Sequence, residues 1–92
     1  MHDTPRVSVL LPTYDAAATL PAALRSLVRQ REPRWECVLV DDGSRDTTRE
    51  IAHAASRADA RIRVFQVPHG GIVAALQAGL AHCRAPVVAR MD

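Results

Sequence analysis

Three carboxylates, a tyrosine ring and two hydroxyl groups follow directly after two apolar segments of the chain. Residues 7–11 run into Pro12-Thr13-Tyr14-Asp15, and residues 37–40 run into Asp41-Asp42-Gly43-Ser44. Carboxylates and hydroxyl groups can hydrogen-bond the N–H and O–H groups of a ligand, and a tyrosine ring can stack on a planar base. The two segments therefore predict a binding site, provided that the fold brings them together.

The elements that must position these residues alternate along the chain. The expected strands are residues 6–11, 35–41, 62–67 and 86–91, and helical stripes of apolar residues separate them. The third stripe runs through Ile72, Ala75, Leu76, Gly79, Leu80 and Cys83. Apolar strands separated by helices predict an α/β fold with a parallel sheet covered on both faces. We expect a Rossmann-like, three-layer βαβαβαβ unit with strand order 3-2-1-4.

Such a sheet places its ligands outside the carboxyl ends of the strands, near the point where the strand order reverses. The expected order puts that point between the first and fourth strands. Pro12 to Asp15, Asp41 to Ser44 and Asp92 then lie along one rim. A carboxylate in the position of Asp92, directly after the fourth strand, could help to hold a divalent cation.

Two of these motifs also suit simple turns. In Asp41-Asp42-Gly43-Ser44, the polar side chains can bind backbone groups and Gly43 can supply a left-handed conformation. Two adjacent carboxylates repel each other, however, and a turn needs one of them, which favours a ligand. His69-Gly70-Gly71 precedes a helix whose N–H groups could receive an anion. Because it lacks the spacing of a phosphate-binding loop, we interpret it as a tight turn with His69 solvated.

Composition limits the classes of protein to which the chain can belong. The 92 residues, 48% hydrophobic and 24% charged, suit one small globular unit. The net charge of +2 does not favour binding to nucleic acid or to an anionic membrane. The sequence has no apolar run near the roughly 20 residues of a membrane span, and its start lacks the apolar region of a signal peptide. With Cys37 and Cys83 interpreted as small core residues, we expect a cytoplasmic location.

In this order and spacing, the motifs resemble the family 2 glycosyltransferases of the GT-A fold. The residues that carry the resemblance are Val7-Ser8-Val9-Leu10-Leu11-Pro12-Thr13-Tyr14-Asp15, Leu24-Arg25-Ser26-Leu27-Val28-Arg29-Gln30, Trp35-Glu36-Cys37-Val38-Leu39-Val40-Asp41-Asp42-Gly43-Ser44, His69-Gly70-Gly71-Ile72-Val73-Ala74-Ala75-Leu76-Gln77-Ala78-Gly79-Leu80 and Arg90-Met91-Asp92. Asp15 and Gln77 stand where Asn is more usual in that family. The last segment resembles the start of its Asp-x-Asp metal motif.

The resemblance implies that residues 1–92 are a single partial domain, the N-terminal nucleotide-sugar-binding half of a glycosyltransferase domain. It implies an inverting transfer of a sugar from a nucleotide-diphosphate sugar, with UDP-sugar expected, to a hydroxyl group of a glycan or lipid-linked acceptor. The residues that would bind the donor nucleotide are Pro12, Thr13, Tyr14, Asp41, Asp42 and Asp92. Asp92 would also bind Mn²⁺ or Mg²⁺, and the cation would neutralise charge on the leaving diphosphate.

The resemblance also implies what these 92 residues lack. The general base and the second metal-binding Asp would lie beyond Asp92, so we expect no catalytic residue in the segment and no activity from it alone. We expect an apolar sheet edge that promotes self-association. In the parent protein, peripheral attachment or tethering to a membrane stays open.

Three rival interpretations remain. A non-catalytic nucleotide-binding module would share the rim residues. A nucleotidyltransferase would carry a Gly-rich basic loop after the first strand, and a Rossmann-type oxidoreductase would carry a Gly-rich turn there. Pro12-Thr13-Tyr14 contains no glycine, which argues against the last two.

Overall fold

The computed structural model describes residues 4–91, so Asp92 lies outside the described residues. Strands and helices alternate in the order β1 (Val7–Thr13), α1 (Leu20–Val28), β2 (Trp35–Asp41), α2 (Thr48–Ala58), β3 (Ile62–Gln66), α3 (Ile72–Leu80) and β4 (Val87–Arg90). The strands form one parallel sheet of order β3-β2-β1-β4. This confirms the predicted α/β class and strand order. None of the helices in residues 4–91 combines the length and apolar content of a membrane span.

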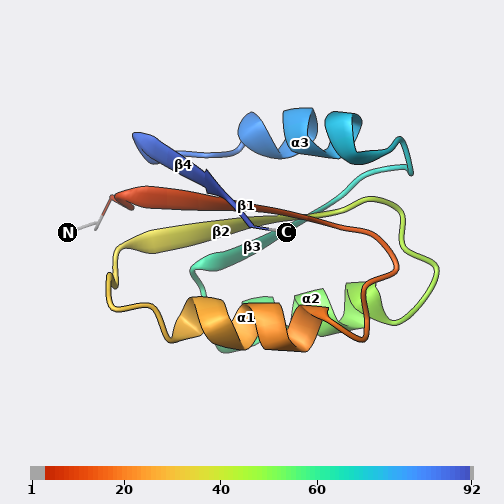
Figure 1. The fold of residues 1–92 in the computed structure, drawn as a ribbon, viewed down its shortest axis with the longest axis horizontal. Coiled ribbons are helices and arrows are strands. Elements are labelled where there is room, and N and C mark those ends of the chain that lie inside the picture. Colours follow the sequence, from red (N-terminus) through yellow and green to blue (C-terminus); the bar gives the residue numbers. More distant parts are fainter. Residues whose placement is uncertain (1–3, 92) are drawn as a thin grey trace.

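The helices cover the sheet on both faces. Figure 1 shows α1 and α2 on one face and α3 on the opposite face. Along the chain, β2 lies beside β1 and β3 lies beside β2, so the sheet grows toward one edge. The chain then crosses back over the sheet through α3, and β4 lies on the other side of β1. The strand order therefore reverses between β1 and β4, where this fold class places its ligands.

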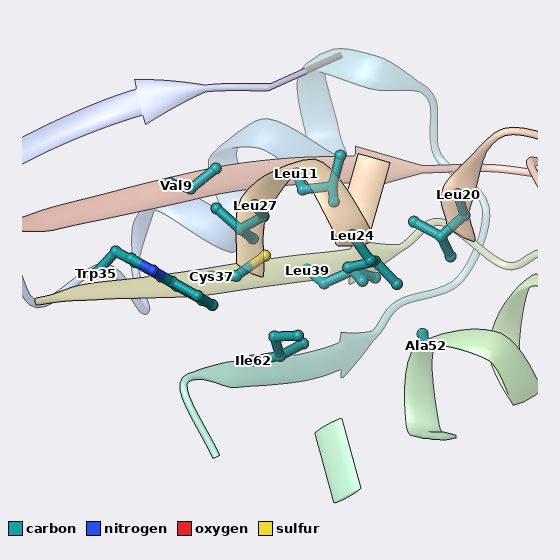
Figure 2. Close-up of a cluster of buried hydrophobic side chains, with 10 residues drawn as sticks. All are labelled: Val9, Leu11, Leu20, Leu24, Leu27, Trp35, Cys37, Leu39, Ala52 and Ile62. Carbon is teal, nitrogen blue, oxygen red and sulfur yellow. The ribbon is translucent and has the colours of Figure 1, made fainter. Parts of the chain in front are cut away.

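The larger part of the core lies between the sheet and α1 and α2. It joins residues of the three strands β1, β2 and β3 to three leucines of α1 (Figure 2). Its buried members are Val9, Leu11, Leu20, Leu24, Leu27, Trp35, Cys37, Leu39, Ala52 and Ile62. All seven residues of β2 are buried, because this strand has neighbours on both sides and helices over both faces. That position explains its continuous apolar sequence.

Helix α3 packs very close to the other face of the sheet. A Cβ atom at Gly79 would overlap Leu10 Cδ1 and lie 2.7 Å from Val40 Cγ2, so glycine is what allows this approach. Ala75 is also buried, whereas Ile72 and Leu80, predicted on the same apolar stripe, are about half exposed. The small residues of α3 face the sheet, together with Leu76, which is partly buried against the core on this side.

Strand β1 continues two residues past its predicted end, to Thr13. The Met91 N–H donates to the Leu10 carbonyl, which places the backbone groups of Leu10 on the β4 side. Two residues on, Pro12 faces the same side and has no N–H to donate. Within the described residues, the β1–β4 pairing runs from Val7 and Val87 to Leu10 and Arg90.

Candidate functional site

The loops that follow β1, β2 and β3 lie at the same end of the molecule (Figure 1). They border a hollow of about 250 Å³, which we call the strand-end hollow. Its lining is Pro12, Thr13, Tyr14, Asp42, His69, Gly71, Ile72 and Ala75. The structure thus brings together four of the residues predicted to bind a nucleotide. A second hollow, of about 310 Å³, shares Pro12, Thr13 and Tyr14 and extends toward α1.

Asp42 binds the backbone of the two residues that directly precede α3. Its side chain is almost fully buried, and Oδ1 accepts a hydrogen bond of 2.9 Å from the Gly70 N–H. Oδ2 accepts from the Gly71 N–H and lies 3.1 Å from His69 Nδ1. The anion at this helix N-terminus is therefore the carboxylate of Asp42. A carboxylate has about four acceptor positions, so one position remains, on Oδ1.

His69 is an exposed loop residue, as predicted, and it also lines the strand-end hollow. Its ring stacks on Tyr14 with centroids 4.1 Å apart and an angle of 21° between the planes. Nδ1 also lies 3.1 Å from the Asp42 carbonyl oxygen. About half of the side chain is exposed. The signal in the sequence was the position of His69 after the third strand, on the same rim as the other two motifs.

Gly43 brings the loop after β2 against the loop after β3. Its φ is +72°, which confirms the left-handed turn predicted for it. A Cβ atom here would lie 2.7 Å from the backbone nitrogen of His69. Glycine is therefore needed both for the conformation and for the close approach of His69.

Asp41 lies beneath the turn and does not line the strand-end hollow. Its side chain is fully buried, and Oδ1 accepts a hydrogen bond of 3.1 Å from the Ser44 N–H. Oδ2 has no hydrogen-bond partner within residues 4–91 and lies 3.9 Å from Arg49 Nε. The two adjacent carboxylates thus serve different backbone groups: Asp41 closes the turn and Asp42 caps α3.

Asp15 ties the loop after β1 to the loop after β2. Its φ is +45°, a conformation that Asp and Asn adopt more readily than most residues. Its N–H donates to Ser44 Oγ at 2.9 Å, and its Oδ1 accepts from the Arg45 N–H at 2.7 Å. These bonds hold the backbone next to Tyr14 in place.

Thr13 lines the hollow at the end of β1. The residue is 6% exposed, and its Oγ1 has no hydrogen-bond partner in the described part of the chain. Strand alternation places its side chain on the same face of the sheet as Val9 and Leu11, opposite α3.

The described residues do not by themselves form a metal centre. Within residues 4–91, no three His, Cys, Asp or Glu side chains lie close enough to hold an ion. The predicted metal-binding and nucleotide-binding roles of Asp92 fall outside the described residues and stay predictions.

Comparison with known proteins assigns the family. The model for "Glycosyl transferase family 2" matches residues 8–92. The chain belongs to glycosyl transferase family 2. This family 2 chain is 34% identical over 88 residues to the uncharacterized glycosyltransferase EpsJ of Bacillus subtilis, covering 96% of the chain and 26% of EpsJ. It is 40% identical over 91 residues to the undecaprenyl-phosphate 4-deoxy-4-formamido-L-arabinose transferase of Pseudomonas syringae, covering 94% of the chain and 27% of that enzyme.

Solved structures of glycosyltransferases share the fold. Staphylococcus aureus TarS (1-349) in complex with UDP-GlcNAc matches with a TM-score of 0.87 and 30% identity, over 95% of this chain and 26% of TarS. The mannosyltransferase PcManGT of Pyrobaculum calidifontis, in complex with GDP-Man and Mn²⁺, matches with a TM-score of 0.84 and 27% identity. The match covers 92% of this chain and 26% of PcManGT. The chain thus spans about a quarter of the proteins that it resembles.

Proposed function

We propose that residues 1–92 form the donor-nucleotide-binding half of an inverting glycosyltransferase that uses a nucleotide-diphosphate sugar, with UDP-sugar as the expected donor. The observation that carries the proposal is the strand-end hollow, where Tyr14, Thr13 and Asp42 from two strand ends line one space. The complexes of TarS with UDP-GlcNAc and of PcManGT with GDP-Man support a nucleotide sugar as ligand.

Each residue of the hollow has a role that its surroundings support. The Tyr14 ring, 37% exposed, offers a stacking surface for the base. The remaining acceptor position on Asp42 Oδ1 supplies a hydrogen bond, and Thr13 contacts the nucleotide from the end of β1. Pro12 lines the hollow beside Tyr14. Asp41 positions the turn that carries Asp42, and we keep it among the proposed nucleotide-binding residues.

A divalent cation belongs to the proposal for the parent protein, with Asp92 as the residue of this chain that would bind it. The complex of PcManGT with Mn²⁺ supports that ion, and we extend the proposal to Mg²⁺. When bound, such an ion supplies positive charge to the leaving diphosphate. We assign no catalytic residue to the segment, because the general base would lie beyond Asp92.

The parent protein would transfer the sugar to a hydroxyl group of a glycan or a lipid-linked acceptor. The undecaprenyl-phosphate transferase among the relatives supports an acceptor of this class. We place the reaction in the cytoplasm and propose that the parent works on or near the membrane that carries such a lipid.

We further propose that the segment alone self-associates through β4. Every residue of β4 is exposed, including Val87 at 55% and Val88 at 42%. An exposed apolar edge strand pairs readily with another strand. Light scattering over a wide range of concentrations should detect dimers or larger species, and a strictly monomeric segment would contradict this proposal.

The proposed function is tested with a panel of UDP-, GDP- and CDP-sugars in the presence of Mn²⁺. We expect calorimetry on the full-length protein to detect binding of at least one of them, and transfer assays to detect turnover. The segment alone should show neither donor hydrolysis nor transfer above background. Absence of nucleotide-sugar binding by the full-length protein would overturn the proposal.

A further inference from the structure

The loop after β1 is fixed by side chains of the segment that follows β2. Both segments lie at the same end of the sheet (Figure 1), and three successive backbone N–H groups of the first donate to side chains of the second. The pairs are Asp15 N–H with Ser44 Oγ, Ala16 N–H with Thr48 Oγ1 and Ala17 N–H with Asp46 Oδ2, at 2.9, 2.8 and 3.3 Å. The backbone directly after Tyr14 is therefore held by side chains from a distant part of the sequence.

Thr48 makes the buried contact of the three. It is the first residue of α2 and is 0% exposed. Its hydroxyl group donates to Asp46 Oδ1, which also accepts the Thr48 N–H at 2.9 Å. Because a hydroxyl group has one hydrogen, its oxygen is then the acceptor for the Ala16 N–H. Asp46 thus sets the direction of the Thr48 hydroxyl group, and that group holds Ala16.

Tyr14 lies between this contact and the end of the sheet. On its amino side, the Thr13 carbonyl oxygen accepts a hydrogen bond of 2.9 Å from the Asp42 N–H. On its carboxyl side, Thr48 holds Ala16. Tyr14 lines the strand-end hollow and is 37% exposed. Its backbone is therefore fixed on both sides, while part of the residue is open to a ligand.

We propose that Thr48 is a positioning residue of the nucleotide site and acts through the loop that carries Tyr14. Thr48 does not belong to the lining of either hollow at this end of the sheet, so it acts on a nucleotide through the backbone that it holds. A loop that is already ordered costs less free energy to order when a ligand binds. This inference rests on the proposed function, in which the base stacks on Tyr14.

Three threonine substitutions in the full-length protein test this contact. Thr48→Val keeps the branched shape and removes the hydroxyl group, whereas Thr48→Ser keeps the hydroxyl group. Thr47→Val is the matched control, because Thr47 is exposed and its side chain makes no capping hydrogen bond. Thr48→Val is also combined with Tyr14→Ala. The probes are UDP, GDP and CDP, each with Mn²⁺, and affinities are compared by calorimetry for the one that the unmodified protein binds most tightly.

Thr48→Val should bind this nucleotide about three- to tenfold more weakly, which is part of the contribution of a stacked base. Thr48→Ser should keep most of the affinity, and Thr47→Val should keep all of it. In the Tyr14→Ala protein, Thr48→Val should weaken binding no further, because two residues that act through one contact are not additive. Thermal unfolding checks that each variant is folded. If Thr48→Val is not folded, Asp46→Ala replaces it, because it removes the carboxylate that directs the hydroxyl group.

The remaining outcomes separate this inference from the proposed function. If Thr48→Val weakens binding by the same factor with and without Tyr14, its role is merely structural, and the inference is overturned while the proposed function stands. A folded Thr48→Val protein with unchanged affinity has the same meaning. If the unmodified protein binds none of the three nucleotides, the proposed function and the inference fail together.

Discussion

Two buried carboxylates at opposite ends of the sheet, Glu36 and Asp42, are satisfied in different ways. At the amino ends of the strands, Glu36 accepts hydrogen bonds from Ser8 Oγ, Arg63 Nη1, the Arg84 N–H and Arg84 Nε. At the carboxyl ends, Asp42 accepts from two backbone N–H groups and the His69 ring. Glu36 is therefore neutralised by two arginines, whereas Asp42 has no arginine among these partners.

The difference separates a structural carboxylate from one that can serve a ligand. Four donors fill the roughly four acceptor positions of Glu36, so nothing is left for another molecule. Asp42 keeps one position and lines the strand-end hollow. We conclude that burial of a carboxylate alone does not identify a site, and that the identity and number of its donors do.

Glu36→Ala tests the carboxylate at the amino ends of the strands. We expect it to have the largest effect, which is on the free energy of unfolding. Removing the carboxylate leaves the partly buried Arg63 guanidinium without its 2.8 Å ion pair, which is expected to lower the free energy of unfolding by about 3–5 kcal/mol. Urea denaturation measures this loss. Nucleotide affinity of the folded protein should stay unchanged, and a loss of affinity without a loss of stability would contradict the division between the two ends.

Gly43→Ala tests the contact between the loops at the other end. A left-handed φ costs a residue with a Cβ about 1–2 kcal/mol, and overlap with His69 adds about 1–3 kcal/mol. Gly70→Ala is the control in the adjoining loop, because its φ is not left-handed and its Cβ would come no closer than 3.3 Å to another residue, at Ala74 Cβ. Chemical denaturation should show a clearly larger loss for Gly43→Ala. Equal losses would mean that neither the left-handed turn nor the contact with His69 is important.

Tyr14→Ala should lower nucleotide affinity by about 1–3 kcal/mol, the contribution of one base stacked on an aromatic ring. The effect on unfolding should be small, because the side chain is partly exposed. Tyr14→Phe keeps the ring and should keep most of the affinity. Calorimetric titration with UDP measures both variants, and equal losses for the two would indicate a role for the hydroxyl group rather than for stacking.

Acid should lower the free energy of unfolding through Glu36, at the amino ends of the strands. We expect this effect to be the smallest of the four predicted effects. Burial raises the pKa of Glu36, but hydrogen bonds from Ser8, Arg84 and Arg63 outweigh burial and hold the pKa below its ordinary value. The folded state therefore favours the charged form. Its contribution to stability is present above the unfolded pKa, about 4.3, and is lost as the pH falls through the folded pKa.

Glu36→Gln should remove this part of the pH dependence. The free energy of unfolding, measured by urea denaturation at several pH values from 7 down to 3, should fall less steeply with acid in the variant than in the unmodified protein. Identical slopes would show that Glu36 does not contribute to acid sensitivity.

The sequence predicts the strand order and four of the residues that line the strand-end hollow. Alternating apolar runs determine which segments form the sheet, and the ends of its strands determine which residues share a rim. The partners across that rim are not predictable in this way. The contact of Asp42 with His69 joins residues 27 positions apart, and it depends on how closely Gly43 lets two loops approach. The complete burial of the Asp41 side chain likewise follows from tertiary packing.

The close packing of α3 on the sheet gives the protein a spectroscopic reporter. Near Gly79, the methyl groups of Leu10 and Val40 lie directly against the helix backbone, with no side chain between them. The other end of the same helix is held by Asp42. Any tilt of α3 caused by a ligand in the hollow would therefore change the surroundings of these methyl groups. Their NMR chemical shifts should follow occupancy of a site that neither residue lines.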